Sequence, residues 1–185
     1  MRRFLDALYA VTLWLAAGCL VAIGLLVGVQ LASRIVDKLL GLVGLSPFGF
    51  IILSLEEFCG FLLAAASFFA LAGTLKAGAH IRVTMLLSAV GETWRRYLEL
   101  WVLGVSAIAA GYIAAQVGGY AFYSWKFNEV SSGVVPLPLF WPQAAMAVGA
   151  GVLAIALLDE FVRVARGGQP TFRQAEDALT LGKEG

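Results

Sequence analysis

Long hydrophobic runs, separated by short polar stretches, dominate the pattern of this chain. A helix needs about 20 mainly apolar residues to cross the hydrocarbon core of a bilayer, which is about 30 Å thick. Runs of this length predict four membrane-spanning helices, over residues 8–32, 54–75, 98–125 and 142–160. The pattern therefore predicts an all-α integral membrane protein that forms a single membrane domain over residues 1–185.

The first run follows two basic residues, Arg2 and Arg3, as the hydrophobic region of a secretory signal peptide also does. Its uncharged part, from Ala7 to Ser33, is longer than such a region, and no clear small-residue cleavage site opens onto a polar segment. We therefore expect a retained transmembrane helix.

The stretch after the first span, residues 35–50, is apolar but is interrupted by Gly41, Gly44, Pro47 and Gly49. It is short for a span, and its leucines suit a helix or coil that lies on the membrane surface. The sequence thus predicts a short interfacial segment between the first and second spans.

Lysine and arginine are distributed unevenly between the polar segments, and their excess marks the cytoplasmic side. Ten of the 13 lie in the N-terminal segment, in the loop between the second and third spans, and in the tail over residues 163–185. The other two loops hold the remaining three, Arg34, Lys38 and Lys126. Both termini are therefore expected in the cytoplasm.

Composition narrows the functions to consider. The chain is 61% hydrophobic and 14% charged, whereas soluble domains are about 45–50% apolar and about 25% charged. A net charge of +1 gives no basic surface for nucleic acid. One histidine with two distant cysteines, Cys19 and Cys59, cannot supply a four-ligand zinc site or a bis-histidine haem. We expect no cofactor, no metal and no enzymatic activity.

Small residues recur three or four positions apart in the predicted spans, which lets helices approach closely in lipid. The clearest sets are Gly24, Gly28 and Ala32 in the first span and Gly104, Ala107, Gly111, Ala115 and Gly118 in the third. The central parts of the first, third and fourth spans hold no charged residue of the kind that transport normally needs. Glu56 and Glu57, at the mouth of the second span, either stabilise the N-terminus of that helix, or one of them turns inward to meet a basic residue, on this chain or on a partner subunit.

The stretch KAGAHIRVTMLL, from Lys76 to Leu87, contains the chain's single histidine. His80 has no acid within one helical turn and no nucleophile in a catalytic arrangement, and Arg82 alone would suit an anchor to lipid phosphate. The stretch resembles the GxHIRVxxLL signature of the small permease subunits of tripartite ATP-independent periplasmic (TRAP) transporters, the DctQ-like family. EEFCGF (residues 56–61) and LPLFWPQAAM (residues 137–146) resemble two further elements of that family, although Gly60 stands where many members carry arginine.

The resemblance implies a non-catalytic scaffold subunit in the bacterial inner membrane. Its implied partners are a large permease subunit of about twelve spans, a periplasmic substrate-binding protein and membrane lipid, in sodium-coupled uptake of an organic acid such as a C4-dicarboxylate or sialic acid. Candidates for contacts with another subunit or with lipid are Glu56, Glu57, Gly78, His80, Arg82, Trp141, Pro142 and Gln143. Gly78 would also end the second helix.

Two other functions fit the composition. A stand-alone small transporter or channel would need a polar residue facing a pore at mid-depth. A non-haem structural subunit of a membrane oxidoreductase is the other alternative.

Overall fold

A computed structural model describes residues 2–77, 92–168 and 171. Within these residues the chain forms four α-helices: α1 (Arg2–Leu42), α2 (Leu55–Lys76), α4 (Glu92–Phe127) and α5 (Phe140–Ala165). All four are long and apolar enough to cross a membrane. The prediction of an all-α membrane protein with four spanning helices is confirmed.

The helix bounds differ from the predicted spans most clearly in α1. This helix has 41 residues and is therefore roughly 60 Å long, and it includes the first half of the segment predicted over residues 35–50. Gly41 does not interrupt it, because a glycine inside a helix costs only about 1 kcal/mol. The helix ends at Leu42, and Gly44 follows with a φ of 76°, a conformation that suits glycine after a helix C-terminus.

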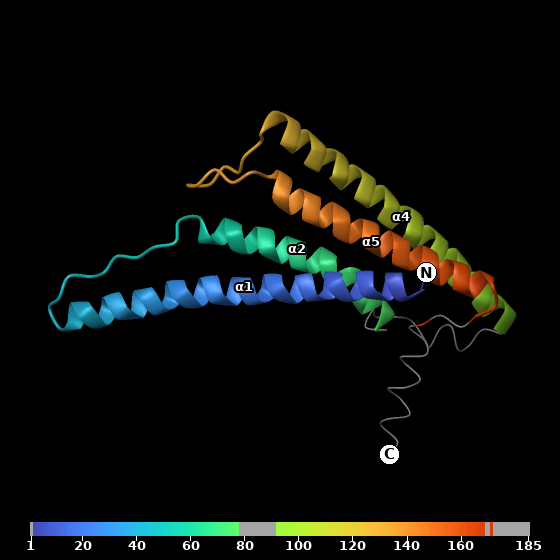
Figure 1. The fold of residues 1–185 in the computed structure, drawn as a ribbon, viewed down its shortest axis with the longest axis horizontal. Coiled ribbons are helices and arrows are strands. Elements are labelled where there is room, and N and C mark those ends of the chain that lie inside the picture. Colours follow the sequence, from blue (N-terminus) through green and yellow to red (C-terminus); the bar gives the residue numbers. More distant parts are fainter. Residues whose placement is uncertain (1, 78–91, 169–170, 172–185) are drawn as a thin grey trace, which may run out of the picture.

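The helices pack in the order α1, α2, α5, α4. In the described part of the chain the main contacts join α1 to α2, α2 to α5, and α5 to α4. Figure 1 shows the helices converging where α1 begins and α5 ends, and spreading apart at the opposite end. We call these the convergent end and the spread end. The arrangement is an open row and not a closed bundle.

The main buried cluster lies toward the convergent end and is built largely from small side chains. Its members are Tyr9, Ala72, Leu75, Leu103, Ala107, Ala110, Val152, Ala156, Leu157 and Val164. Two helices approach each other closely at Gly149 of α5, where an added Cβ would lie 2.6 Å from the carbonyl carbon and oxygen of Phe68 in α2. Alanine and glycine therefore set how closely this row packs, as expected for helices in lipid.

The small-residue sets predicted in the first and third spans have different outcomes. In α4, Ala107 is buried, and Gly104 and Gly118 face side chains of α5. In α1, Gly24 and Gly28 are exposed, and no atom lies within 4 Å of a Cβ added at either. Three of the five residues of the α4 set thus serve packing within the chain, whereas Gly111 and Ala115 of that set and the set in α1 are uncovered within the described residues.

Candidate functional site

The residues singled out from the sequence lie at the starts of two helices. Glu56 and Glu57 are in the first turn of α2, and Trp141, Pro142 and Gln143 are in the first turn of α5. Both helices begin at the spread end (Figure 1). Three further candidates, Gly78, His80 and Arg82, lie outside the described residues.

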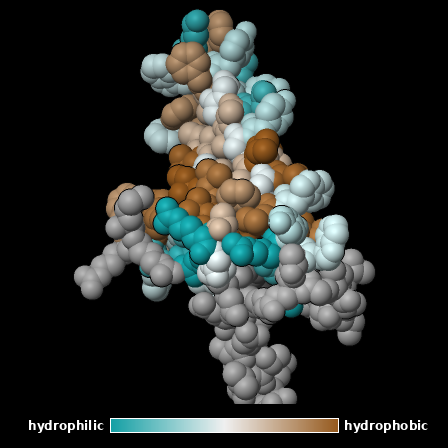
Figure 2. Space-filling model, turned by 90° about the vertical axis from the view of Figure 1, so that its right-hand side faces the viewer, coloured by the Kyte–Doolittle hydropathy of each residue, from teal (hydrophilic) through white to brown (hydrophobic). Residues whose placement is uncertain are grey.

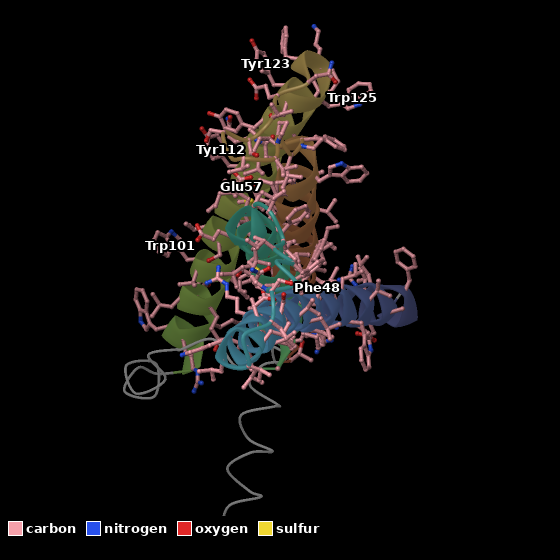
Figure 3. All side chains as sticks on the ribbon, turned by 90° about the vertical axis from the view of Figure 1, so that its left-hand side faces the viewer. Phe48, Glu57, Trp101, Tyr112, Tyr123 and Trp125 are labelled. Atoms are coloured by element: carbon pink, nitrogen blue, oxygen red, sulfur yellow. The ribbon has the colours of Figure 1, made fainter. Side chains whose placement is uncertain are left out.

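Glu57 makes its contact within the chain. Its Oε2 accepts a hydrogen bond of 3.0 Å from the Ser131 hydroxyl, and a Cβ added to Gly133 would lie 2.2 Å from its carboxyl carbon. Ser131 and Gly133 belong to the connection between α4 and α5, residues 128–139, which we call the α4–α5 loop. The glycine thus lets the loop backbone rest directly on the Glu57 carboxylate; Glu57 is labelled in Figure 3.

Ser54 fixes the same loop from the position before α2. It has a left-handed conformation (φ 56°, ψ 28°), and its side chain makes no cap hydrogen bond to its own helix. Instead its hydroxyl oxygen accepts a 2.9 Å bond from the Val135 amide, while its carbonyl accepts one of 3.0 Å from the Glu57 amide. Ser54 and Glu57 therefore attach the start of α2 to the α4–α5 loop.

The α4–α5 loop is itself ordered as a short hairpin. The Ser131 amide donates to the Leu137 carbonyl at 2.8 Å, and the Leu139 amide donates to the Glu129 carbonyl at 3.1 Å. Ser124, buried near the end of α4, donates from its hydroxyl to the Glu129 carboxylate at 2.8 Å. These bonds satisfy polar groups that would otherwise be costly close to hydrocarbon.

The other candidates at the spread end differ in exposure. Glu56 is exposed and makes no hydrogen bond or ion pair with a described residue. Trp141 is 70% exposed, whereas Pro142 is buried in the first turn of α5, where its missing N–H is not needed. The Oε1 atom of Gln143 is buried with no hydrogen-bond donor among the described residues. Glu56 and Trp141 are thus the two candidates available to another molecule.

Charged residues missed by the sequence reasoning gather at the convergent end. Glu160, 1% exposed, accepts hydrogen bonds from the amide of Thr171, at 2.9 Å, and from its hydroxyl. Lys76 lies 2.5 Å from an Asp6 carboxylate oxygen and 4.4 Å from the centre of the Tyr9 ring. In the sequence, Glu160 looked like an interfacial residue because arginines follow it closely. Neighbouring helices bury Glu160, and the residues next to it in the sequence do not indicate that burial.

A comparison with protein families decides the identity. The family model described as "Tripartite ATP-independent periplasmic transporters, DctQ component" matches residues 45–167, well over half of the chain. The chain belongs to this family. The resemblance to the small permease subunit of TRAP transporters is thereby confirmed. A search of curated proteins gave no match.

The matched range of this DctQ component begins after Gly44. It contains α2, α4, the α4–α5 loop and α5. It therefore includes the contact of Glu57 with Ser131 and Gly133, and the first turn of α5. All of α1 precedes it. Family membership supports a role as a membrane component of a transporter.

A second polar contact, which the sequence reasoning also missed, lies on α1 of the DctQ component. Gln30 accepts a 2.8 Å bond from the Ile52 amide, the Ser33 hydroxyl donates to the Phe50 carbonyl at 2.9 Å, and Asp37 accepts from the Phe48 amide at 2.7 Å. We call these three side chains the polar ladder. Their spacing of three and four residues places them on one helix face. This spacing is the feature of the sequence that could have indicated the polar ladder.

The connection between α1 and α2, residues 43–54, runs back along α1, and the polar ladder holds it there. Backbone groups that lack hydrogen bonds are costly in lipid, so an extended segment beside a membrane helix needs such partners. The same connection exposes large hydrophobic side chains, including Phe48 at 76%, which Figure 3 labels beside α1. The ladder is therefore a structural device that presents an apolar segment to lipid or to a partner.

No group of three or more histidine, cysteine, aspartate or glutamate side chains that could hold a metal ion occurs among residues 2–77, 92–168 and 171. The side chains of Ser54 and Glu57 and those of the polar ladder instead make hydrogen bonds between helices and loops. These polar side chains therefore attach the loops to the helices.

Proposed function

We propose that this chain is the small scaffold subunit of a TRAP transporter, supporting a large permease subunit in sodium-coupled uptake of an organic acid such as a C4-dicarboxylate or sialic acid. Family membership supports a transporter component. The observation that carries the scaffold role is the absence of a charged side chain from the central turns of all four described helices. The buried carboxylate, Glu160, lies five residues before the end of α5.

The open row supports the same role. A chain that moves a solute unaided needs polar groups around an enclosed path at mid-depth. Here the helices of the described part pack mainly in the order α1, α2, α5, α4, with only a small additional contact between α1 and α5. Two broad outer surfaces result, with no ring of helices between them. Such surfaces are suited to lying against a larger membrane protein.

The surface we assign to the large subunit is the outer face of α4. Trp101 and Tyr112 are 68% and 65% exposed and point away from the other helices (Figure 3). Tyr112 is near the middle of the 36-residue helix, so its hydroxyl lies deep in hydrocarbon, and no described residue bonds to it. An unpaired hydroxyl there is costly. A protein partner with a hydrogen-bonding group at that depth would remove the cost, whereas lipid tails would not.

The α4 face extends along most of the helix. Its exposed large side chains recur three or four residues apart from Trp94 to Tyr112, and Tyr123 lies about three turns further along the helix; the first set is Trp94, Tyr97, Trp101, Val105, Ile108 and Tyr112. Large aromatic side chains of this kind are enriched where proteins meet. The face therefore offers a largely apolar surface whose central polar groups are the Tyr112 hydroxyl and the exposed Gln116, which suits a large membrane-embedded partner.

The remaining expectations form part of the same proposal. With both termini in the cytoplasm of a cell bounded by an inner membrane, the spread end faces the periplasm, where the exposed Glu56 and Trp141 are placed for the binding protein or the large subunit. Pro142 and Gln143 support that region from the start of α5. Gly78, His80 and Arg82 are proposed to hold the cytoplasmic connector to lipid or to the large subunit.

Co-purification tests the proposal. The full chain, carrying an affinity tag, is co-expressed with a large permease subunit of a TRAP transporter, and the amount of permease retained in mild detergent is measured. Trp101→Leu combined with Tyr112→Phe should lower retention several-fold. Trp14→Leu is the matched control, because Trp14 is an equally exposed tryptophan on α1 (78%), and it should leave retention unchanged. A homo-oligomer of this chain that transports unaided in liposomes would overturn the proposal.

A further inference from the structure

A groove opens at the convergent end, between the first turns of α1 and the last turns of α5. Its volume is about 820 Å³. Leu5 contributes from α1, and Ile155, Leu158, Val162 and Arg163 contribute from α5. Figure 2 views the molecule from this end and shows hydrophobic and hydrophilic surface side by side. The groove thus joins an apolar part to a charged part.

The apolar part runs along one face of α5. Ile155, Leu158 and Val162 are spaced three and four residues apart and are 43%, 52% and 41% exposed. From Ile155 to Arg163 the helix rises roughly 12 Å, which is the length of several methylene groups of an acyl chain. This part can therefore hold a hydrocarbon chain that lies parallel to the helix.

The charged part has two arginines without partners. Arg163 and Arg166 line the groove one turn apart, and neither side chain makes a hydrogen bond or ion pair with a described residue. Other arginines at the same end are engaged: Arg95 pairs with Glu99 at 3.4 Å, and Arg96 donates to the Ala165 carbonyl at 3.0 Å. A guanidinium group has donors placed to bind two phosphate oxygens at once.

We propose that this groove binds one anionic phospholipid. The phosphate lies between Arg163 and Arg166, and an acyl chain lies along Ile155, Leu158 and Val162 toward the membrane interior. Basic pockets between transmembrane helices are a known kind of site for anionic headgroups, and the pair of charges at the end of a membrane helix is at the depth of the phosphates. The inference needs only that the chain is embedded in a membrane, so it is independent of the scaffold role.

Asp159 makes the site more selective. It also lines the groove, one turn from Arg163 toward the helix centre, and forms no ion pair with a described residue. Its carboxylate repels a phosphate that enters too deeply, so the headgroup stays beside the arginines. The site as built has two positive charges and one negative charge, and Asp159→Asn should strengthen its hold on an anionic lipid.

Native mass spectrometry of the full chain tests the site. The protein is released from nanodiscs that contain equal amounts of phosphatidylglycerol and phosphatidylcholine, and retained lipid is counted. Wild type should retain phosphatidylglycerol preferentially. Arg163→Gln and Arg166→Gln should each lower retention about fivefold, and the double variant about thirtyfold, since each basic side chain near an anionic headgroup contributes about that factor. Arg34→Gln, an exposed arginine near the far end of α1, is the control and should change nothing.

Three further arms separate the alternatives. Leu158→Trp keeps both arginines and fills the apolar part, so it should abolish retention, and unchanged retention would overturn the proposal. Millimolar inorganic phosphate should not displace the lipid, because the acyl chain supplies much of the binding. Displacement would mean a free-phosphate site. Loss of retention in Asp159→Asn would mean recognition of a headgroup amine and would also overturn the proposal.

Discussion

Gly149 sets the distance between α2 and α5, and replacing it tests how the row packs. In Gly149→Ala the new Cβ would lie 2.6 Å from the carbonyl carbon and oxygen of Phe68 and 2.8 Å from its Cβ. These are atoms of the backbone and of the first side-chain position, so no rotamer change relieves the contact. Ordinary van der Waals contact begins near 3.4 Å, and the helices must therefore separate by most of an ångström.

The expected cost follows from overpacking. Forcing an extra methyl group into a close-packed contact costs about 1–3 kcal/mol. Gly151→Ala is the matched control, since Gly151 lies in the same helix and nothing is within 4 Å of its added Cβ. That substitution should be neutral or should gain up to about 1 kcal/mol from helix propensity. The two variants should thus differ by roughly 1–4 kcal/mol in the free energy of unfolding.

Unfolding of the purified full chain in a fixed detergent mixture, titrated with dodecyl sulfate and followed by circular dichroism, gives the comparison. Disulfide trapping between cysteines placed in α2 and α5 gives a second readout of their separation. We expect lower stability and slower trapping in Gly149→Ala alone. Equal stability of the two variants would show that α2 and α5 do not approach here as described, and would refute the packing order of the row.

Three other substitutions test the attachments between loops and helices. Glu57→Ala should free the α4–α5 loop at a cost of about 1–3 kcal/mol, seen as faster amide exchange at Ser131, whereas Glu56→Ala should leave that exchange unchanged; equal effects of both would contradict the contact. Asp37→Ala should raise exchange at the amides of residues 48 and 49 while α1 stays helical, and no change would mean that the polar ladder does not hold the connection. Glu160→Ala removes the acceptor of the Thr171 bonds and should lower the free energy of unfolding by about 1–3 kcal/mol, measured in the same titration; no change would contradict its buried role.

The number and type of helices could be predicted from the sequence because membrane insertion depends on the length of an apolar run, which is a local property. The end of α1 could not be predicted, since Gly41 is as compatible with a helix as with a break. The contact of Glu57 joins residues 74 positions apart, and no local pattern encodes which loop an acid will meet. The order α1, α2, α5, α4 likewise depends on which small residues face one another, as Gly149 and Phe68 do.

The polar ladder follows from a mismatch in helix length. The Lys76–Asp6 pair fixes the register of α2 against α1, so the start of α2 at Leu55 lies beside a point close to residue 27 of α1. The remaining part of α1, to Leu42, extends roughly 23 Å beyond α2. The connection over residues 43–54 could reach roughly 40 Å if fully extended, so it has enough length to return along this overhang with turns at Gly44 and Gly49, both of which have positive φ. That surplus length leaves backbone groups without regular partners, and Gln30, Ser33 and Asp37 lie on the overhanging part of α1 where they supply them. The three polar residues on this face of α1 are thus explained by the geometry of the chain around them, and shortening the connection should unwind the end of α1 before it disturbs α2.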